Sequence, residues 1–263
     1  RVASRGLGDV YKRQGEILCS VSSPGFNPNI FSSDLEIDDW NKVKNNSRAP
    51  LLNRSMAGVY PPGSTIKMAV ALAGLESGII DQNTKFFCKG YKELGTSTFH
   101  CWSKEGHGNL SLMEAIEQSC DVYFYELGLK IGIDRIALMM RKLGLGQYYD
   151  LEIDDKAKGV VPNIAWKLKR DGISWSLGET LNASIGQGYI LATPLQLVTM
   201  VSRIANSRYA VNPTLMINKK TDNFKTLDIN QEHIKFIKKS MEMVVVGKKG
   251  TAKHHKIGKN NIE

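Results

Sequence analysis

Apolar residues recur at helical spacing along four stretches of this chain, and the spacing predicts four helices. The stretches are residues 68–75, 112–127, 133–143 and 234–245. Residues 68–75 form the longest nearly continuous apolar run in the chain, which only Gly74 interrupts. We therefore expect this run to form a buried helix.

Capping and chain-breaking residues predict where two helices begin. Thr193 can accept a hydrogen bond from a helix whose first residue is Pro194, and apolar positions continue to Ile204. Residues 61–63, Pro-Pro-Gly, break the chain immediately before Ser64. A loop is therefore expected to lead into the N-terminus of the buried helix at this serine.

The remaining segments are less regular. Residues 15–21 are rich in β-forming side chains and precede a Ser-Ser-Pro-Gly turn signal, which predicts a strand. Residues 22–63 are mostly loop-forming with a short helical signal after Ser33, residues 86–109 are a polar, glycine-rich insertion, and residues 146–176 are irregular. Short strands alternating with long helices predict an α/β or α+β fold.

Composition indicates an ordinary globular protein. The 263 residues are 42% hydrophobic and 23% charged, and no apolar run is long enough to cross a bilayer. The net charge of +9 is concentrated in residues 219–263, whose eleven lysines and five acidic residues give +6. Aromatic residues are nearly absent from that segment and no nucleic-acid motif occurs, so we expect a solvated basic surface rather than a nucleic-acid site. A basic surface also suits a position near anionic lipid.

The pattern Ser64-Thr-Ile-Lys67 is the first candidate for chemistry. Residues three apart on a helix share one face, so the hydroxyl and the amine can meet. Serine becomes a nucleophile when a neighbouring base takes its proton, and free N–H groups at a helix start suit a developing oxyanion. Taken alone the pattern is common, and an N-cap serine beside a surface lysine explains it equally well.

A second candidate is the triplet Ser119-Cys-Asp121, which opens a helical stretch. A second hydroxyl near a Ser–Lys pair can relay a proton to a leaving amine. Asp121 can hydrogen-bond Lys67 or orient a substrate. Alone, Ser119 is equally explained as a helix cap.

Together these segments resemble a known family. Tyr60-Pro-Pro-Gly-Ser-Thr-Ile-Lys67 is similar to the first catalytic motif of the penicillin-binding proteins, and Ser119-Cys-Asp121 resembles their second motif, with Asp in place of Asn. Other stretches resemble the penicillin-binding protein 2 branch, the class B transpeptidases of cell elongation, in order from Gly15 onward. They are Gly15-Glu-Ile-Leu, Pro50-Leu-Leu-Asn-Arg54, His100-Cys-Trp102, Gly106-His-Gly108, Gly178-Glu-Thr180, Ser184-Ile-Gly-Gln-Gly188 and Thr193-Pro-Leu-Gln-Leu197. One departure is Tyr149-Asp-Leu-Glu-Ile153, where the branch usually has Thr-Gly-Ile-Asp-Leu.

The resemblance implies an α+β fold of the serine β-lactamase and penicillin-binding transpeptidase type, in which an antiparallel sheet is flanked by helices. It implies that Ser64 attacks the penultimate D-Ala carbonyl of a peptidoglycan stem peptide. An amine from a second strand then resolves the acyl-enzyme, and β-lactams acylate the same serine. Lys67, Ser119 and Asp121 complete the implied catalytic set, and no cofactor or metal is expected.

The resemblance also implies a cellular setting. The expected location is the periplasmic side of the cytoplasmic membrane, with an anchoring N-terminal helix that this sequence does not include. The expected partner is a membrane glycosyltransferase of the elongation machinery. Residues 1–14 have no helix or strand period and resemble translated sequencing adapter, so residues 15–263 are expected to be a partial transpeptidase domain.

The family's third motif, Lys-Thr-Gly on a strand, has one apparent match. This is Lys248-Lys-Gly-Thr-Ala252, which directly follows a predicted helix and lacks the apolar alternation of a strand. We expect it to be a loop and the true motif to lie beyond Glu263. The C-terminal strands of the sheet would then be missing, and this fragment would be inactive.

Two other serine-acylation functions remain as alternatives. A serine β-lactamase needs a carboxylate to activate water, and Glu179-Thr-Leu-Asn182 is a weak candidate whose spacing is one residue short. A β-lactam-sensing receptor domain uses the same serine and lysine without turnover. The stretches 106–108 and 184–188 favour the transpeptidase over both.

The four cysteines, Cys19, Cys88, Cys101 and Cys120, contain no Cys-x-x-Cys pattern. We expect Cys88 and Cys101 to approach disulfide distance, with two buried thiols as the alternative. A zinc site formed by Cys88, His100, Cys101 and His107 has the right residue types but no common zinc spacing. Adjacent His100 and Cys101 cannot easily face one ion, so this third interpretation is the least favoured.

Overall fold

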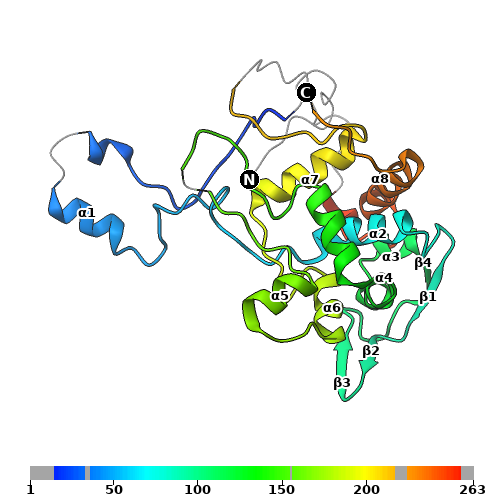
Figure 1. The fold of residues 1–263 in the computed structure, drawn as a ribbon. Helices are drawn as coiled ribbons and strands as arrows, with labels where there is room; N and C mark the ends of the chain where they lie inside the picture. The colour runs from blue at the N-terminus through cyan, green and yellow to red at the C-terminus, as the bar shows by residue number, and fades with distance from the viewer. Residues whose placement is uncertain (1–14, 33–35, 155, 217–223, 256–263) are drawn as a thin grey trace.

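The computed structural model describes residues 15–32, 36–154, 156–216 and 224–255, and the expected adapter segment 1–14 lies outside them. In chain order (Figure 1) its elements are the 3₁₀ helix Pro28–Phe31, α1 Ile37–Lys44, the 3₁₀ helix Gly63–Ile66, α2 Lys67–Glu76, β1 Lys85–Cys88, β2 Tyr91–Leu94, β3 Ser97–His100, β4 Gly108–Ser111, α3 Leu112–Glu117, α4 Asp121–Lys142, α5 Ile164–Asp171, α6 Leu177–Ser184, α7 Pro194–Asn206, α8 Gln231–Val246 and the 3₁₀ helix Lys253–His255. Helices together with antiparallel strands confirm the predicted α+β class.

Helix α2 is the centre of the hydrophobic core. It packs against α4 and α8, while α4 also packs on α6 and α3 packs on α8 (Figure 1). Residues Ala69 through Leu75 are all buried, so the helix is apolar around its whole circumference. This confirms the buried helix predicted from the run 68–75 and gives Ser64 and Lys67 a rigid support.

The predicted helix over residues 112–127 is two helices. The chain breaks between α3 and α4 because Ser119 adopts a left-handed backbone conformation, with φ 51°. Cys120 then caps α4, its sulfur accepting the N–H of Tyr123. No Gly or Pro marks this break in the sequence. The break places Ser119 between the end of α3 and the start of α4.

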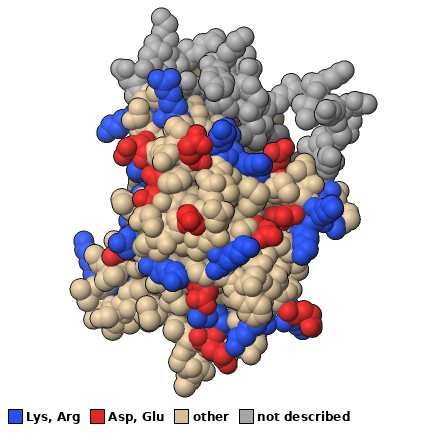
Figure 2. Space-filling model, turned by 90° about the vertical axis from the view of Figure 1, so that its right-hand side faces the viewer, with Lys and Arg blue, Asp and Glu red and all other residues tan. Residues whose placement is uncertain are grey.

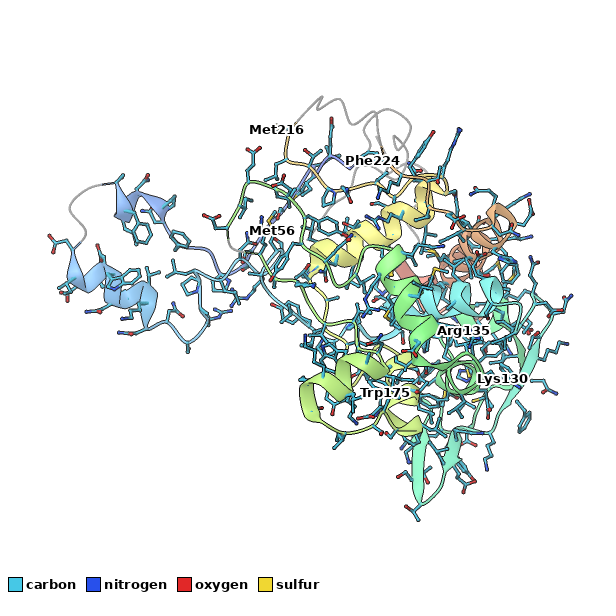
Figure 3. The ribbon with its side chains drawn as sticks, viewed as in Figure 1. Met56, Lys130, Arg135, Trp175, Met216 and Phe224 are labelled. Carbon is cyan, nitrogen blue, oxygen red and sulfur yellow. The ribbon has the colours of Figure 1, made fainter. Side chains whose placement is uncertain are left out.

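Helix α4 continues through the two stretches that were predicted separately, with a kink between them. Gly132 has φ 75° and ψ 160°, which are not helical angles. Lys130 and Arg135, labelled in Figure 3, lie on the two sides of this kink. The glycine therefore bends the helix without ending it.

The polar insertion 86–109 contains two small antiparallel sheets, which sequence patterning did not predict. Strand β1 pairs with β4, and β2 pairs with β3 as a hairpin at the lower edge of Figure 1. Their side chains are largely exposed, so they lack the alternation of half-buried strands. The strand predicted over residues 15–21 is wrong, because only a single bridge joins Glu16 to Thr214. A strand requires a partner strand along its length, and among the described residues this run has strand pairing only at Glu16.

Local capping signals decide the later helices. Helix α7 begins at Pro194 with a capping box between Thr193 and Gln196, as predicted. Helix α8 also confirms its prediction. The prediction of irregular structure over residues 146–176 is wrong where α5 forms, since Asn163 caps its first turn and Gly172 ends it.

The turn after α8 bears on the expected third motif. The backbone N–H of Lys249 donates to Glu117 Oε1 at 2.9 Å, and the N–H of Thr251 donates to the carbonyl of Glu117 at 3.2 Å. Lys248 and Lys249 lie in this turn. The prediction that the Lys-Lys-Gly run is not a strand is therefore confirmed.

Charge on the surface is mixed. Over the face in Figure 2, Lys and Arg side chains are interspersed with Asp and Glu, and no large patch of one sign appears among the described residues. None of the helices that the structure describes has the length and apolar character needed to span a membrane.

Candidate active site

Ser64 lies at the surface where the chain enters the central helix. It is exposed, within the 3₁₀ turn Gly63–Ile66, and its carbonyl accepts the N–H of Lys67. The entering chain is held just before Pro61, because Tyr60 and Ala192 exchange two backbone hydrogen bonds of 2.9 Å. The serine is thus presented to solvent from a fixed backbone, as a nucleophile requires.

A close backbone contact fixes the residue before the serine. The N–H of Gly63 donates to the carbonyl of Gly186 at 3.0 Å. Gly186 has φ +76°, and a Cβ atom there would lie 2.1 Å from the carbonyl oxygen of Gly63. Only glycine allows this approach. The stretch 184–188 therefore has a direct structural role beside Ser64.

Lys67 is buried one helical turn after Ser64, with 2% of its surface exposed. Its Nζ donates to the Ser119 carbonyl at 2.8 Å, to Ser119 Oγ at 3.1 Å and to Asp121 Oδ1 at 2.7 Å. These contacts use all three donors of an ammonium group. The structure therefore brings three of the four sequence candidates into one hydrogen-bonded set, with Ser64 on the adjoining turn.

A second buried lysine, Lys167, holds the start of α6, the helix that precedes Gly186. Lys167 on α5 pairs with Glu179 at the start of α6, beside the rings of Trp175 (labelled in Figure 3) and Tyr189. Burial opposes ionisation of Glu179, but hydrogen bonds from Lys167 and Ser176 outweigh it and lower the pKa of that carboxyl. This carboxylate is committed to Lys167 and to the cap of α6.

Three cysteines and one histidine converge immediately behind the second motif. One ligand atom from each of Cys88, Cys101, His107 and Cys120 lies within 4.8 Å of all the others. His107 Nδ1 is 3.5 Å from Cys88 Sγ and 3.6 Å from Cys101 Sγ. We call these four residues the Cys₃His cluster.

The cluster bears on two expectations. The sulfurs of Cys88 and Cys101 lie within 4.8 Å of each other, but both are free, buried thiols, which is the alternative to a disulfide. The imidazole of His107 lies against both sulfurs. His100, a member of the zinc set considered from sequence, does not take part; its side chain is exposed. Its place is taken by Cys120, which lies inside the Ser119-Cys-Asp121 motif and was not considered as a ligand.

The environment of Cys101 favours a thiolate. A hydrogen bond from the Cys120 thiol lowers the pKa of Cys101 to about 5, against the opposing effect of burial. Backbone N–H groups of Ser103, Asp121 and Val122 add to this effect, two of them at the N-terminus of α4. The same contact raises the pKa of Cys120. A deprotonated sulfur at a helix start is the form that binds metal ions.

Two distances within the cluster fit the geometry of a structural zinc site. With sulfur at about 2.3 Å and nitrogen at about 2.0–2.1 Å from a tetrahedral zinc ion, sulfur and nitrogen stand ~3.6 Å apart. The measured 3.5 and 3.6 Å agree with this separation. Four protein ligands leave no open position, so such an ion would be structural.

Comparisons with known proteins agree with the motifs. A family model described as the penicillin binding protein transpeptidase domain matches residues 10–261. The peptidoglycan D,D-transpeptidase MrdA of Acinetobacter baumannii is 42% identical over 206 residues, 78% of this chain and 31% of that protein. The chain spans about a third of the length of the curated relatives it matches.

Solved structures give the same result. PBP2 of Helicobacter pylori in complex with MreC superimposes with a TM-score of 0.87 at 38% identity, over 92% of this chain and 45% of that chain. Pseudomonas aeruginosa PBP2 in complex with WCK 5153 gives a TM-score of 0.83 at 35% identity, over 90% of this chain and 54% of that chain.

Proposed function

Because this chain belongs to the penicillin-binding protein transpeptidase family, we propose that the whole protein is a serine D,D-transpeptidase that cross-links peptidoglycan stem peptides. The observation that carries the proposal is the contact of one buried amine, Lys67 Nζ, with both Ser119 Oγ and Asp121 Oδ1, one turn from the exposed Ser64.

In the proposed reaction Lys67 acts in its neutral amine form: Ser64 Oγ attacks the penultimate D-Ala carbonyl while the lone pair of Lys67 Nζ takes the serine proton. Asp121 holds the amine in place, and Ser119 passes a proton to the departing D-Ala. Backbone N–H groups at the start of the helix stabilise the oxyanion. An amine from a second stem peptide then attacks the acyl-enzyme and releases Ser64. β-Lactams acylate the same oxygen.

The β-lactamase alternative has less support. Its water-activating carboxylate would have to be Glu179, whose Oε2 accepts the N–H and hydroxyl of Ser176 while Oε1 pairs with Lys167. A carboxylate engaged at both oxygens is poorly suited to activate a water.

We place the whole protein on the periplasmic side of the cytoplasmic membrane, with a membrane glycosyltransferase of the elongation machinery as partner. The H. pylori relative forms a complex with MreC, which suggests a comparable scaffold for this protein. Pull-down of a tagged whole protein from crosslinked cells tests both partners.

Covalent labelling tests the catalytic assignment. A fluorescent penicillin is expected to label the whole protein, and Ser64→Ala is expected to abolish the label. Lys67→Ala is expected to slow acylation by on the order of a hundred-fold or more, because it removes the general base. Label that survives Ser64→Ala would contradict the assignment of the nucleophile.

For the Cys₃His cluster we propose a Zn²⁺ ion that ties β1, the loop 101–107 and α4 together behind Ser119 and Asp121. The four converging ligand atoms support this proposal, which differs from the expectation from sequence that the chain binds no metal. The ion would hold these segments by its four bonds and would take no part in the acyl transfer.

A further inference from the structure

Trp102 makes three hydrogen bonds to the second motif and the residue before it, although sequence analysis assigned it no role. Its backbone N–H donates to Asp121 Oδ2 at 3.0 Å. Its indole N–H is shared between the carbonyls of Gln118 and Ser119, each at 3.1 Å. One residue therefore contacts the carboxylate that holds Lys67 and the backbone that carries the Ser119 hydroxyl.

These bonds act where the backbone is strained. Ser119 has φ 51°, a region that residues other than glycine enter at a cost, and it persists only when its surroundings fix it. The Ser119 carbonyl accepts Lys67 Nζ on one side and the Trp102 indole on the other. Removing the indole donor would leave the lysine as the only partner of this carbonyl among the described residues.

Packing alone does not explain the position of Trp102. Its side chain is 61% exposed, so burial of its ring contributes little to the core. The ring meets His107 edge-on, with centroids 5.3 Å apart. His107 and Cys101 both belong to the Cys₃His cluster. Trp102 therefore follows Cys101 in the chain and packs its ring against His107.

We propose that Trp102 is a positioning residue for acyl transfer, whose indole N–H fixes the Ser119 backbone and thereby aligns Ser119 Oγ with Lys67. This inference rests on the proposed transpeptidase function. In this role Trp102 affects the reaction by positioning Ser119 rather than by contacting the substrate.

The first test separates binding from chemistry. Trp102→Phe keeps an aromatic ring and the backbone N–H but removes the indole donor. We expect the acylation rate constant at saturating fluorescent penicillin to fall about tenfold, as loss of one such hydrogen bond would give. The apparent dissociation constant of the non-covalent complex is expected to change less than about twofold.

Trp166→Phe is the matched control. Trp166 lies on α5, its ring stacks on Arg170 and Tyr189, and its indole makes no hydrogen bond to the described residues. It should acylate at the wild-type rate. An unchanged acylation rate in Trp102→Phe would overturn the proposal and show that the indole has no role. A change in the dissociation constant alone would overturn it in favour of direct contact with the ligand.

The second test does not depend on activity. In the ¹⁵N-labelled protein, the indole resonance that disappears in Trp102→Phe is expected to exchange its proton with water at least about tenfold more slowly than a free indole. An exposed ring without the bonds to Gln118 and Ser119 would exchange at the free rate, which would refute the positioning role. If Ser64→Ala still acylates while this protection is present, the proposed function fails and the contact stands.

Discussion

At the residue scale, Lys67 is the most constrained side chain of the site. A buried ammonium group is tolerated because Asp121 supplies the opposite charge and Ser119 supplies two further oxygens. Removal of one partner of such a pair leaves a buried charge without compensation. The three contacts that hold Lys67 in place therefore also stabilise the fold.

We expect Asp121→Ala to lower the free energy of unfolding by about 3 kcal/mol, measured by denaturant titration. Lys67 is 2% and Asp121 13% exposed, so water can replace the carboxylate only in part. Asp39→Ala is the control, because Asp39 and Lys42 form an exposed pair on α1 whose loss should change stability far less. Equal losses in the two variants would contradict the buried-pair argument.

Gly186 gives a second prediction at this scale. A Cβ atom in Gly186→Ala would overlap the Gly63 carbonyl, so the segment that carries Ser64 must move. We expect acylation by penicillin to fall at least about a hundred-fold, as misplacement by roughly 1 Å can cause.

Gly172→Ala controls for backbone strain in that experiment. Gly172 has φ +69°, close to that of Gly186, but nothing lies within 4 Å of a Cβ atom there. The control should lose about 1 kcal/mol of stability and keep its acylation rate. Loss of acylation in both variants would mean that strain, and not the contact with Gly63, is responsible.

At the scale of elements, capping boxes start three of the helices around the site. Helices α3, α6 and α7 each begin with a Ser or Thr whose side chain accepts a backbone N–H, paired with a Glu or Gln that accepts the cap's own N–H. The two glutamates make the starts of α3 and α6 sensitive to acid. The glutamine of α7 does not titrate.

Helix α3 gives the pH prediction. The backbone N–H of Ser111 and, with a smaller effect, its hydroxyl donate hydrogen bonds to Glu114. These bonds lower the pKa of that carboxyl below its usual value. A carboxyl whose pKa is lower in the folded than in the unfolded state stabilises the protein at pH values above its unfolded-state pKa. That stabilisation is lost as the pH falls through its folded-state pKa. Between pH 5 and pH 3, the melting temperature of wild type should fall more steeply than that of Glu114→Gln.

Ser111→Ala is the companion variant, because it removes the hydroxyl donor but keeps the backbone N–H. Its pH dependence should lie between those of wild type and Glu114→Gln. Parallel melting curves for all three proteins would show that the capping box is not the source of the acid sensitivity.

At the scale of the whole molecule, the Cys₃His cluster joins segments that lie far apart in the sequence. Cys88 ends β1, Cys101 and His107 bound a loop, and Cys120 caps α4. A metal ion that binds only the folded cluster stabilises the protein by about 4 kcal/mol at a thousand-fold excess over its dissociation constant.

We therefore expect one equivalent of Zn²⁺ per chain by elemental analysis. Removal of the metal by a chelator should lower the melting temperature by roughly 8–16 °C, taking about 2–4 °C per kcal/mol for a protein of this size. Cys101→Ser should lose both the metal and the effect of the chelator. Cys19→Ser, outside the cluster, should keep both. Absence of bound metal in the wild-type protein purified without chelator would refute the zinc site.

Much of the fold followed from signals that act over a few residues. Thr193 and Pro194 fixed the start of α7, and the apolar run 68–75 fixed α2 as buried. The wrong predictions involve partners far along the chain. Residues 15–21 have strand-forming side chains, yet pairing is limited to the bridge at Glu16, because a strand exists only where another strand lies beside it.

The sequence by itself determined which reactive groups are present. These are a serine and a lysine three residues apart and a separate Ser-x-Asp triplet, both in motifs typical of one family. Only the tertiary structure decided what these groups touch. Lys67 meets Asp121 because α2 packs on α4, and Cys88 meets Cys120 because β1 lies against α4. Hydrogen bonds and metal ligation require atoms within a few ångströms, and packing of distant segments, not spacing along the chain, brings them that close.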